Sequence, residues 1–175
     1  MKITLNENST IAELKAAEKF LGEKVIAGGQ EWDENNGPRD YGYVYIVRSI
    51  DTKERHIDGD IIDPNSGKLI CENQRIGNFC ADWEVTVETV EDSNYVAPEY
   101  TAIVYDCNGD KSHFDGKNKK GILKEIGEWV NNQVEYMGQC TIELTKRGEK
   151  EISDYKLPAG RKTAILMGKE DIVEW

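Results

Sequence analysis

The feature that most constrains this fold is a stripe of apolar residues, spaced three and four apart, within residues 118–137. The stripe consists of Ile122, Leu123, Ile126, Trp129, Val130, Val134 and Met137. This spacing predicts an amphipathic helix that packs one face onto a core. Residues 100–107 and 110–114, just before it, have the composition of strands, and Asn108-Gly109 between them predicts a β-hairpin. This part of the chain therefore reads as a hairpin covered by a helix.

A shorter helical signal occurs near the start of the chain. Thr10 and Glu13 match the capping-box pattern that opens many helices, and Gly22 predicts where this helix ends. The apolar residues expected on its buried face are Ile11, Leu14, Ala17 and Leu21.

Most of the remaining chain has the pattern of β-strands. The expected strands are residues 1–5, 43–50, 54–62, 68–71, 83–90, 140–145 and 163–167. Asp63-Pro64-Asn65-Ser66-Gly67 predicts a tight turn between two of them. In contrast, the chain between Ile26 and Tyr41 is rich in Gly, Asn, Asp and Pro, so we expect a loop there.

These elements predict an α+β fold in which two helices pack on mainly antiparallel β-sheet. The connector around Pro98 divides an acidic α+β half, residues 1–97, from a hairpin, helix and strand half, residues 98–175. One continuous domain is the alternative. The four cysteines have no C-x-x-C spacing, so we expect free thiols.

The two halves are candidate pseudo-repeats. His56-Ile57-Asp58-Gly59 returns 57 residues later as His113-Phe114-Asp115-Gly116, and the same shift aligns Tyr43 with Tyr100. Two unrelated hairpins could also share this much by chance. A true repeat would place both tetrapeptides at equivalent positions of equivalent hairpins.

Charge is distributed unevenly along the sequence. Residues 1–100 contain twenty Asp and Glu against ten Lys and Arg, whereas residues 101–175 contain thirteen against twelve, and the net charge is −11. Phosphates would be repelled by the acidic part, which argues against unaided binding to nucleic acid or to anionic lipid. A basic protein is the partner class that this charge favours.

Two acidic segments are the candidate partner-binding surface. Trp32 lies in the first segment, and tryptophan is a frequent anchor at protein interfaces. In the second segment, outward carboxylates on a strand would repeat about every 6.6–7 Å, close to the spacing of phosphates along a DNA strand. Acidity that serves only solubility is the alternative. The candidate residues are Glu31, Trp32, Asp33, Glu34, Asp82, Glu84, Glu88, Glu91 and Asp92.

A basic cluster lies at the expected start of the long helix. Lysines there oppose the helix dipole, and together with free backbone amides they could bind an anion such as a nucleic-acid phosphate. An acidic patch on a second copy of this chain would also fit and would give a homodimer. Alternatively, the lysines form a solvated turn neutralised by Glu125 and Glu128. The cluster consists of Lys117, Lys119, Lys120 and Lys124.

No catalytic signature is present, so we expect a non-enzyme without a cofactor. His56, Asp58 and Asp60 alternate onto one face of an expected strand and form a weak candidate metal site, with solvated polar residues as the alternative. The start of the sequence is too polar for a signal peptide, and no apolar run reaches the roughly 18 residues of a membrane span. The sequence therefore predicts a cytoplasmic protein.

Together these features predict a small acidic binding protein that inhibits a basic, nucleic-acid-handling protein as a DNA mimic or decoy. Anti-defence proteins of phages and mobile elements, such as anti-CRISPR and anti-restriction proteins, share this character and size, although no motif supports the comparison. One alternative is a protein that contacts nucleic acid through Lys117–Lys124. A toxin-neutralising immunity protein is another alternative.

Overall fold

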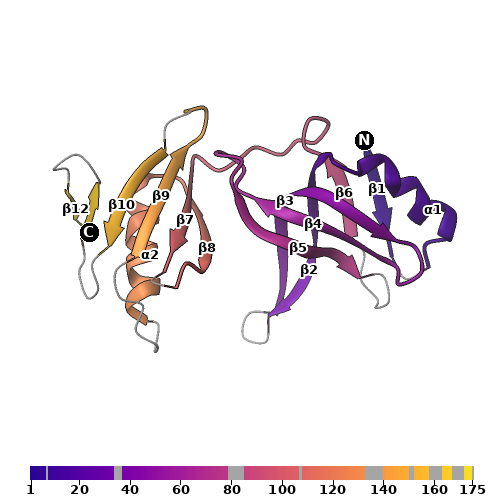
Figure 1. Cartoon of the computed structure of the whole chain (residues 1–175), viewed down its shortest axis with the longest axis horizontal. Helices are drawn as coiled ribbons and strands as arrows, with labels where there is room; N and C mark the ends of the chain where they lie inside the picture. The colour runs from indigo at the N-terminus through magenta and orange to yellow at the C-terminus, as the bar shows by residue number, and fades with distance from the viewer. Residues whose placement is uncertain are drawn as a thin grey trace. The chain divides into compact units, whose positions relative to one another are not determined.

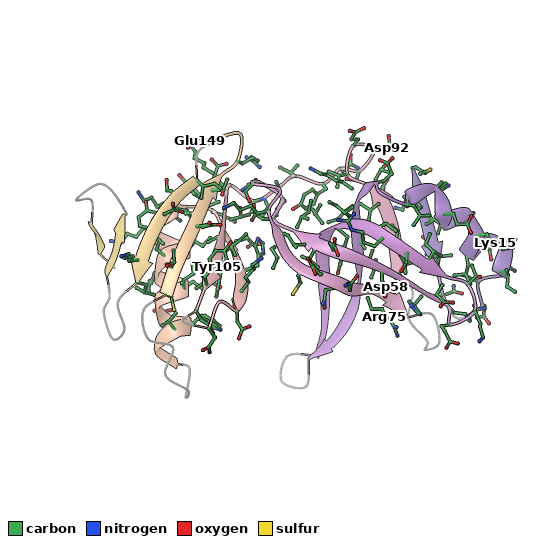
Figure 2. All side chains as sticks on the ribbon, in the orientation of Figure 1. Lys15, Asp58, Arg75, Asp92, Tyr105 and Glu149 are labelled. Carbon is green, nitrogen blue, oxygen red and sulfur yellow. The ribbon has the colours of Figure 1, made fainter. Side chains whose placement is uncertain are left out.

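A computed structural model of the chain shows two helices and two antiparallel β-sheets, which confirms the α+β class (Figure 1). It describes residues 1–6, 8–33, 37–78, 85–106, 108–132, 140–149, 152–157, 163–166 and 172–174. Side chains are described for most of these residues and are drawn in Figure 2; the exceptions are residues 28–33, 37–43, 77–78, 131–132, 163–166 and 172–174.

The chain folds into two compact units. The first unit comprises Met1–Ile62 and Cys71–Val96, and the second comprises Asp63–Ile70 and Ala97–Trp175. We call Asp63–Ile70 the strap, because it interrupts the first unit in sequence but belongs to the second. The expected boundary near residue 97 would place the strap in the first half of the chain, whereas its contacts group it with the second unit.

The first unit contains a six-stranded sheet in the order β1-β6-β2-β3-β4-β5. Its strands are β1 (Lys2–Leu5), β2 (Lys24–Asp33), β3 (Gly37–Asp51), β4 (His56–Ile62), β5 (Leu69–Asn78) and β6 (Val85–Thr89). Strand alternation gives the sheet its buried face: in β6, for example, Val85 and Val87 are buried as expected, and Thr86 between them is half-buried.

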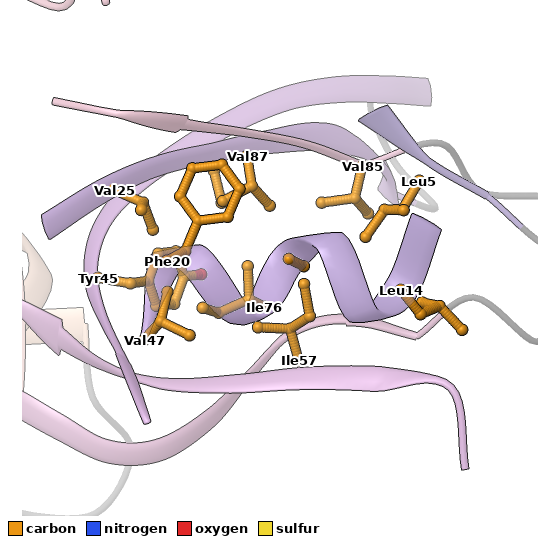
Figure 3. Close-up of a cluster of buried hydrophobic side chains, with 12 residues drawn as sticks. Leu5, Leu14, Phe20, Val25, Tyr45, Val47, Ile57, Ile76, Val85 and Val87 are labelled. Atoms are coloured by element: carbon orange, nitrogen blue, oxygen red, sulfur yellow. The ribbon is translucent and has the colours of Figure 1, made fainter. Parts of the chain in front are cut away.

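A short helix packs on that buried face (Figure 3). α1 (Ile11–Ala16) begins with the expected capping box between Thr10 and Glu13, and it continues into the 3₁₀ helix η1 (Ala17–Phe20). Gly22 follows in the left-handed region at φ 79°, which glycine adopts without strain. The core residues are Leu5, Leu14, Ala17, Phe20, Val25, Ala27, Tyr45, Val47, Ile57, Ile76, Val85 and Val87.

Two expectations for the first unit are wrong. The helical face was expected to include Ile11 and Leu21, but these are 59% and 48% exposed, and Phe20 is buried in their place. The 3₁₀ turn at the end of the helix shifts the periodicity towards three residues. The expected loop between Ile26 and Tyr41 is instead a hairpin of β2 and β3, paired as far as Asp33 and Gly37.

The second unit contains a sheet in the order β12-β11-β10-β9-β7-β8 and the long helix. Its elements are β7 (Tyr100–Tyr105), β8 (Lys111–Gly116), α2 (Lys119–Asn132), β9 (Cys140–Lys146), β10 (Ile152–Leu157), β11 (Thr163–Leu166) and β12 (Ile172–Glu174). The expected apolar stripe of α2 is confirmed for Ile122, Leu123, Ile126 and Val130, which pack on Ala102, Val104 and Ile142. Val134 and Met137 lie outside the described residues.

The Asn108-Gly109 hairpin forms, and its register contradicts the 57-residue repeat. In the second unit Ile103 pairs with His113, so a repeat would pair Ile46 with His56. Ile46 pairs with Asp60 instead. His56 therefore stands at the start of β4, whereas His113 lies inside β8, because β3 continues to Asp51 and its turn comes later along the chain.

Cys71 and Cys140 are free thiols, as expected, and Cys80 and Cys107 lie outside the described residues. Within the described part of the chain, neither helix is long and apolar enough to span a membrane.

Candidate functional site

The first acidic segment lies on a β-ribbon. Glu31, Trp32 and Asp33 are the last residues of β2, and their backbone partners in β3 are Arg39, Pro38 and Gly37. Glu34 and the side chains of the other three residues lie outside the described part of the structure. The sequence thus located the segment, but not its strand conformation.

On one side this ribbon extends past β4; on the other side, residues 79–84 before β6 lie outside the described part of the chain. The described pairing of β2 with β6 covers only Val25–Gly28, and that of β3 with β4 begins at Val44. Between these limits and the hairpin end, β2 and β3 pair only with each other among the described residues (Figure 1). Two-stranded ribbons of this kind are marginally stable by themselves.

The second acidic segment is only partly described. Asp82 and Glu84 lie outside the described residues. Glu88 lies on β6 and faces Lys2 of β1, with 3.9 Å between the carboxylate and the ammonium nitrogen. Asp92 accepts a 2.6 Å hydrogen bond from the Thr89 hydroxyl and pairs with the amino group of Met1, so Glu91 is the unpaired member of the described set.

A hollow of about 540 Å³ lies beside Glu91. Its lining mixes both signs of charge, with Lys19 and Lys24 opposite Glu23, Glu91 and Asp92. This composition does not form a uniformly negative groove, and the predicted carboxylate array is not assembled by the described residues.

Carboxylates on β4 are paired with arginines. Asp60 accepts a 2.6 Å hydrogen bond from Arg48, and its other oxygen accepts the backbone amide of Asn73, a β5 residue at φ 52°. The Asn73 amide and then Arg48 hold the pKa of Asp60 below its usual range. Asp58 lies 3.7 Å from the Arg75 guanidinium, and Figure 2 labels this pair.

The structure does not bring the three candidate metal ligands together. His56 does contact Asp58, at 3.0 Å between Nε2 and Oδ2, but Asp60 is turned to Arg48 and Asn73 instead. Across the described residues, no group of three or more His, Cys, Asp or Glu side chains is arranged to hold a metal ion. The guanidinium groups of Arg48 and Arg75 lie against the Asp60 and Asp58 oxygens that a metal ion would need.

The structure divides the lysine cluster into two kinds of residue. Lys119 lies over the Tyr155 ring at 5.1 Å, and Lys124 pairs with Glu128 at 3.6 Å. Lys117 and Lys120 are exposed and make no ion pair with any described residue. The Asn118 side chain accepts the Gly121 amide at 2.8 Å, so one of the free amides expected at this helix start is capped.

The most buried charged contact is one that the sequence did not predict. Asp63 of the strap is 1% exposed, and its Oδ2 lies 3.0 Å from Nε2 of His113 in β8. Its Oδ1 accepts the backbone amides of Asn65 and Ser66, at 3.1 and 2.6 Å, and the Ser66 hydroxyl at 2.7 Å. Burial raises the pKa of Asp63, but hydrogen bonds from His113 and Ser66 outweigh burial and lower that pKa to about 2.

A second polar group joins the strap to β9. Lys68 pairs with Oε1 of Glu143 at 2.8 Å, and the Tyr105 hydroxyl donates to Oε2 of the same carboxylate at 2.9 Å. Burial raises the pKa of Tyr105 to about 12, and the hydrogen bond and negative charge of Glu143 act in the same direction. Sequence reasoning missed these residues because they are 38 to 75 positions apart and share no short motif.

Comparisons with protein-family models, with curated proteins and with solved structures found no match to this chain. Arguments about its function therefore depend on the geometry and charge described above.

Proposed function

We propose that this protein acts by binding, and that its first unit presents a negative surface to a basic protein that handles nucleic acid. The observation that carries the proposal is how charge divides between the units. The first unit holds eighteen Asp and Glu against nine Lys and Arg, and the second holds fifteen against thirteen. Nine of the eleven net negative charges thus belong to one unit.

Pairing within the first unit does not remove this excess. Asp58 and Asp60 are matched by Arg75 and Arg48, but other carboxylates are exposed and make no ion pair within the described residues. They are Glu18, Glu23, Glu72 and Glu91. A surface of this kind accelerates association with a basic partner and makes association sensitive to salt.

The β2–β3 ribbon supplies a shape for this binding. A two-stranded ribbon is a narrow element, with its strands about 5 Å apart, and this ribbon carries Glu31 and Asp33 next to Trp32. Such an element could enter a protein groove that normally holds nucleic acid. The carboxylates would face the basic residues that normally contact phosphates. An inhibitor or decoy of the anti-defence type would act in this way.

The test is displacement of nucleic acid from a partner. Proteins captured by the immobilised chain are purified and loaded with labelled DNA or RNA, and the free chain is then titrated in at several salt concentrations. Wild-type chain should release the nucleic acid, and the variant Glu31→Lys/Asp33→Lys should be at least about tenfold weaker. The variant Glu23→Lys/Glu72→Lys is the matched control, because it changes charge equally elsewhere in the unit. A partner that keeps its nucleic acid contradicts the proposal.

A second candidate function is direct contact with nucleic acid through the start of α2. It is favoured by Lys117 and Lys120, which are exposed and unpaired within the described part of the chain. A gel-shift titration of the purified chain with duplex DNA separates the two functions. Salt-sensitive binding that is lost in Lys117→Glu/Lys120→Glu would support the second candidate and contradict a pure decoy.

A further inference from the structure

We propose that the strap is a movable segment that closes over the second sheet on the face opposite α2, and that Asp63 is the latch that holds it closed. The strap is grouped with the second unit, although its last two residues, Leu69 and Ile70, begin β5 of the first sheet. The proposal is independent of the acidic surface.

The covered face is identified by strand alternation. Ala102 and Val104 of β7 pack against α2, so Thr101 and Ile103 lie on the opposite face of the sheet. Thr101 and Ile103 are nevertheless 0% and 2% exposed. A strand face that is this buried on the side away from its helix needs a cover.

Strap residues contact that same face at two strands, β8 and β9. Asp63 bonds to His113 of β8, and Lys68 pairs with Glu143 of β9. The Lys111 ammonium of β8 donates to the backbone oxygen of Leu69 at 2.9 Å. Ile103 pairs with both His113 and Glu143 in register, so these contacts lie on either side of it.

The strap is held by polar contacts more than by apolar packing. Asp63 is its only fully buried residue, and the other seven are half-buried or exposed. Segments with few buried apolar contacts open locally at a lower cost in free energy than core strands do. Asn65 of the strap also donates to the backbone oxygen of Pro98 at 3.1 Å. The contacts of Asp63 are the ones made by a fully buried side chain, so we expect their loss to weaken closure most.

Opening would change the chemistry of the sheet face. The apolar side chain of Ile103 and the hydroxyl of Thr101 would be uncovered, and the His113 imidazole and the Glu143 carboxylate would lose their strap partners. When the strap is closed, it supplies partners for His113 and Glu143. When it is open, these two side chains would form a polar rim around the apolar Ile103.

Hydrogen–deuterium exchange on the full-length chain tests the proposal. Asp63→Asn keeps the size of the side chain and an acceptor for the turn amides, but removes the charge that faces His113. The expected result is exchange at least about tenfold faster in residues 63–70 and 111–116, with little change in residues 25–27 and 44–47. Asp51→Asn is the matched control, because Asp51 accepts two turn amides in the same way but contacts no sheet face.

A second variant keeps the test decisive if Asp63→Asn does not fold. His113→Ala removes the partner on the sheet and leaves the turn intact, and it should accelerate exchange in the same segments. Unchanged exchange in the strap would overturn the proposal. An equal increase in the exchange rates of β7, β9 and the strap would also overturn the proposal, since Asp63 would then stabilise the whole unit and not the strap in particular.

Discussion

At the scale of single residues, three aspartates hold turns in the same way. Asp51, Asp63 and Asp106 each accept two backbone amides from residues two to four positions further along the chain. These hydrogen bonds favour the ionised carboxylate, and they lower the pKa values of Asp51 and Asp63. Part of the acidic composition therefore stabilises turns, and a count of carboxylates alone does not separate these residues from ones free to contact a partner.

Asp63 gives the chain a measurable dependence on acid. Its pKa of about 2 lies below the ordinary 3.8, so the ionised form stabilises the folded state. This contribution, about 2 kcal/mol, is complete above about pH 4 and is lost as the pH falls towards 2. We expect Asp63→Asn to lower the free energy of unfolding by at least about this amount at pH 7, with the gap to wild type closing below pH 4. Urea unfolding at a series of pH values measures it, and a constant gap would contradict the pKa argument.

Gly59 in β4 is a position where any side chain would collide with its neighbours. A Cβ there would lie 2.7 Å from the Ile46 carbonyl oxygen and 2.8 Å from Cδ1 of Ile76. We expect Gly59→Ala to lower the free energy of unfolding by about 1–3 kcal/mol. Adding Ile76→Val removes only the side-chain contact, so a double-mutant cycle should show partial recovery. Full recovery would mean that the backbone contact is unimportant.

At the scale of elements, local signals succeeded where a short stretch determines its own conformation. The capping box at Thr10, the turn from Asp63 to Gly67 and the apolar stripe of α2 are confirmed. The β2–β3 hairpin was missed because its glycines and asparagines favour a loop locally, and cross-strand pairing outweighs that preference.

At the candidate sites, too, the sequence indicated local features but not long-range contacts. The sequence indicated exposed lysines and an acidic strand, and the structure describes Lys117, Lys120 and Glu88 accordingly. The sequence could not indicate that Asp60 faces Arg48, because this contact is set by the register of the sheet. Nor could it indicate that Asp63 contacts His113, which lies 50 residues further along the chain. Long-range pairing leaves no spacing pattern in a single sequence.

The capping box makes a direct prediction for α1. Thr10 Oγ1 accepts the Glu13 amide at 3.2 Å, and the Glu13 carboxylate returns a contact to the Thr10 amide at 2.6 Å. We expect Thr10→Ala to lower the free energy of unfolding by about 1 kcal/mol, because this short helix loses its cap. Thr10→Ser retains the hydroxyl and should remain close to wild type in thermal unfolding. An equal loss of stability in both variants would mean that packing of Thr10, and not its capping hydrogen bond, stabilises the helix.

At the scale of the whole molecule, the two units differ in their electrostatics. The first unit carries a net charge of −9 and the second −2, although they contain similar numbers of residues. Like charges within one compact unit repel one another and oppose its folding. This repulsion therefore lowers the free energy of unfolding of the first unit more than that of the second.

Added salt should screen this repulsion and stabilise the first unit more than the second. Raising sodium chloride from about 10 mM to about 150 mM shortens the screening length from about 30 Å to about 8 Å. We expect slower amide exchange in residues 25–27 and 45–47 of the first unit, with a smaller change in residues 102–104 of the second. Equal responses in the two units would show that ion pairs such as Arg48–Asp60 offset the repulsion.

Asn73 also bears on how the chain avoids unwanted assembly. β5 is the last strand in the order of the first sheet, and a long, regular outer strand is a template on which foreign strands can aggregate. The left-handed backbone at Asn73, whose amide donates to the Asp60 carboxylate, is a local irregularity within β5. An irregular outer strand is a poorer template for a foreign strand than a regular one is. The residue that completes the Asp60 contact thus also makes this edge of the sheet less regular.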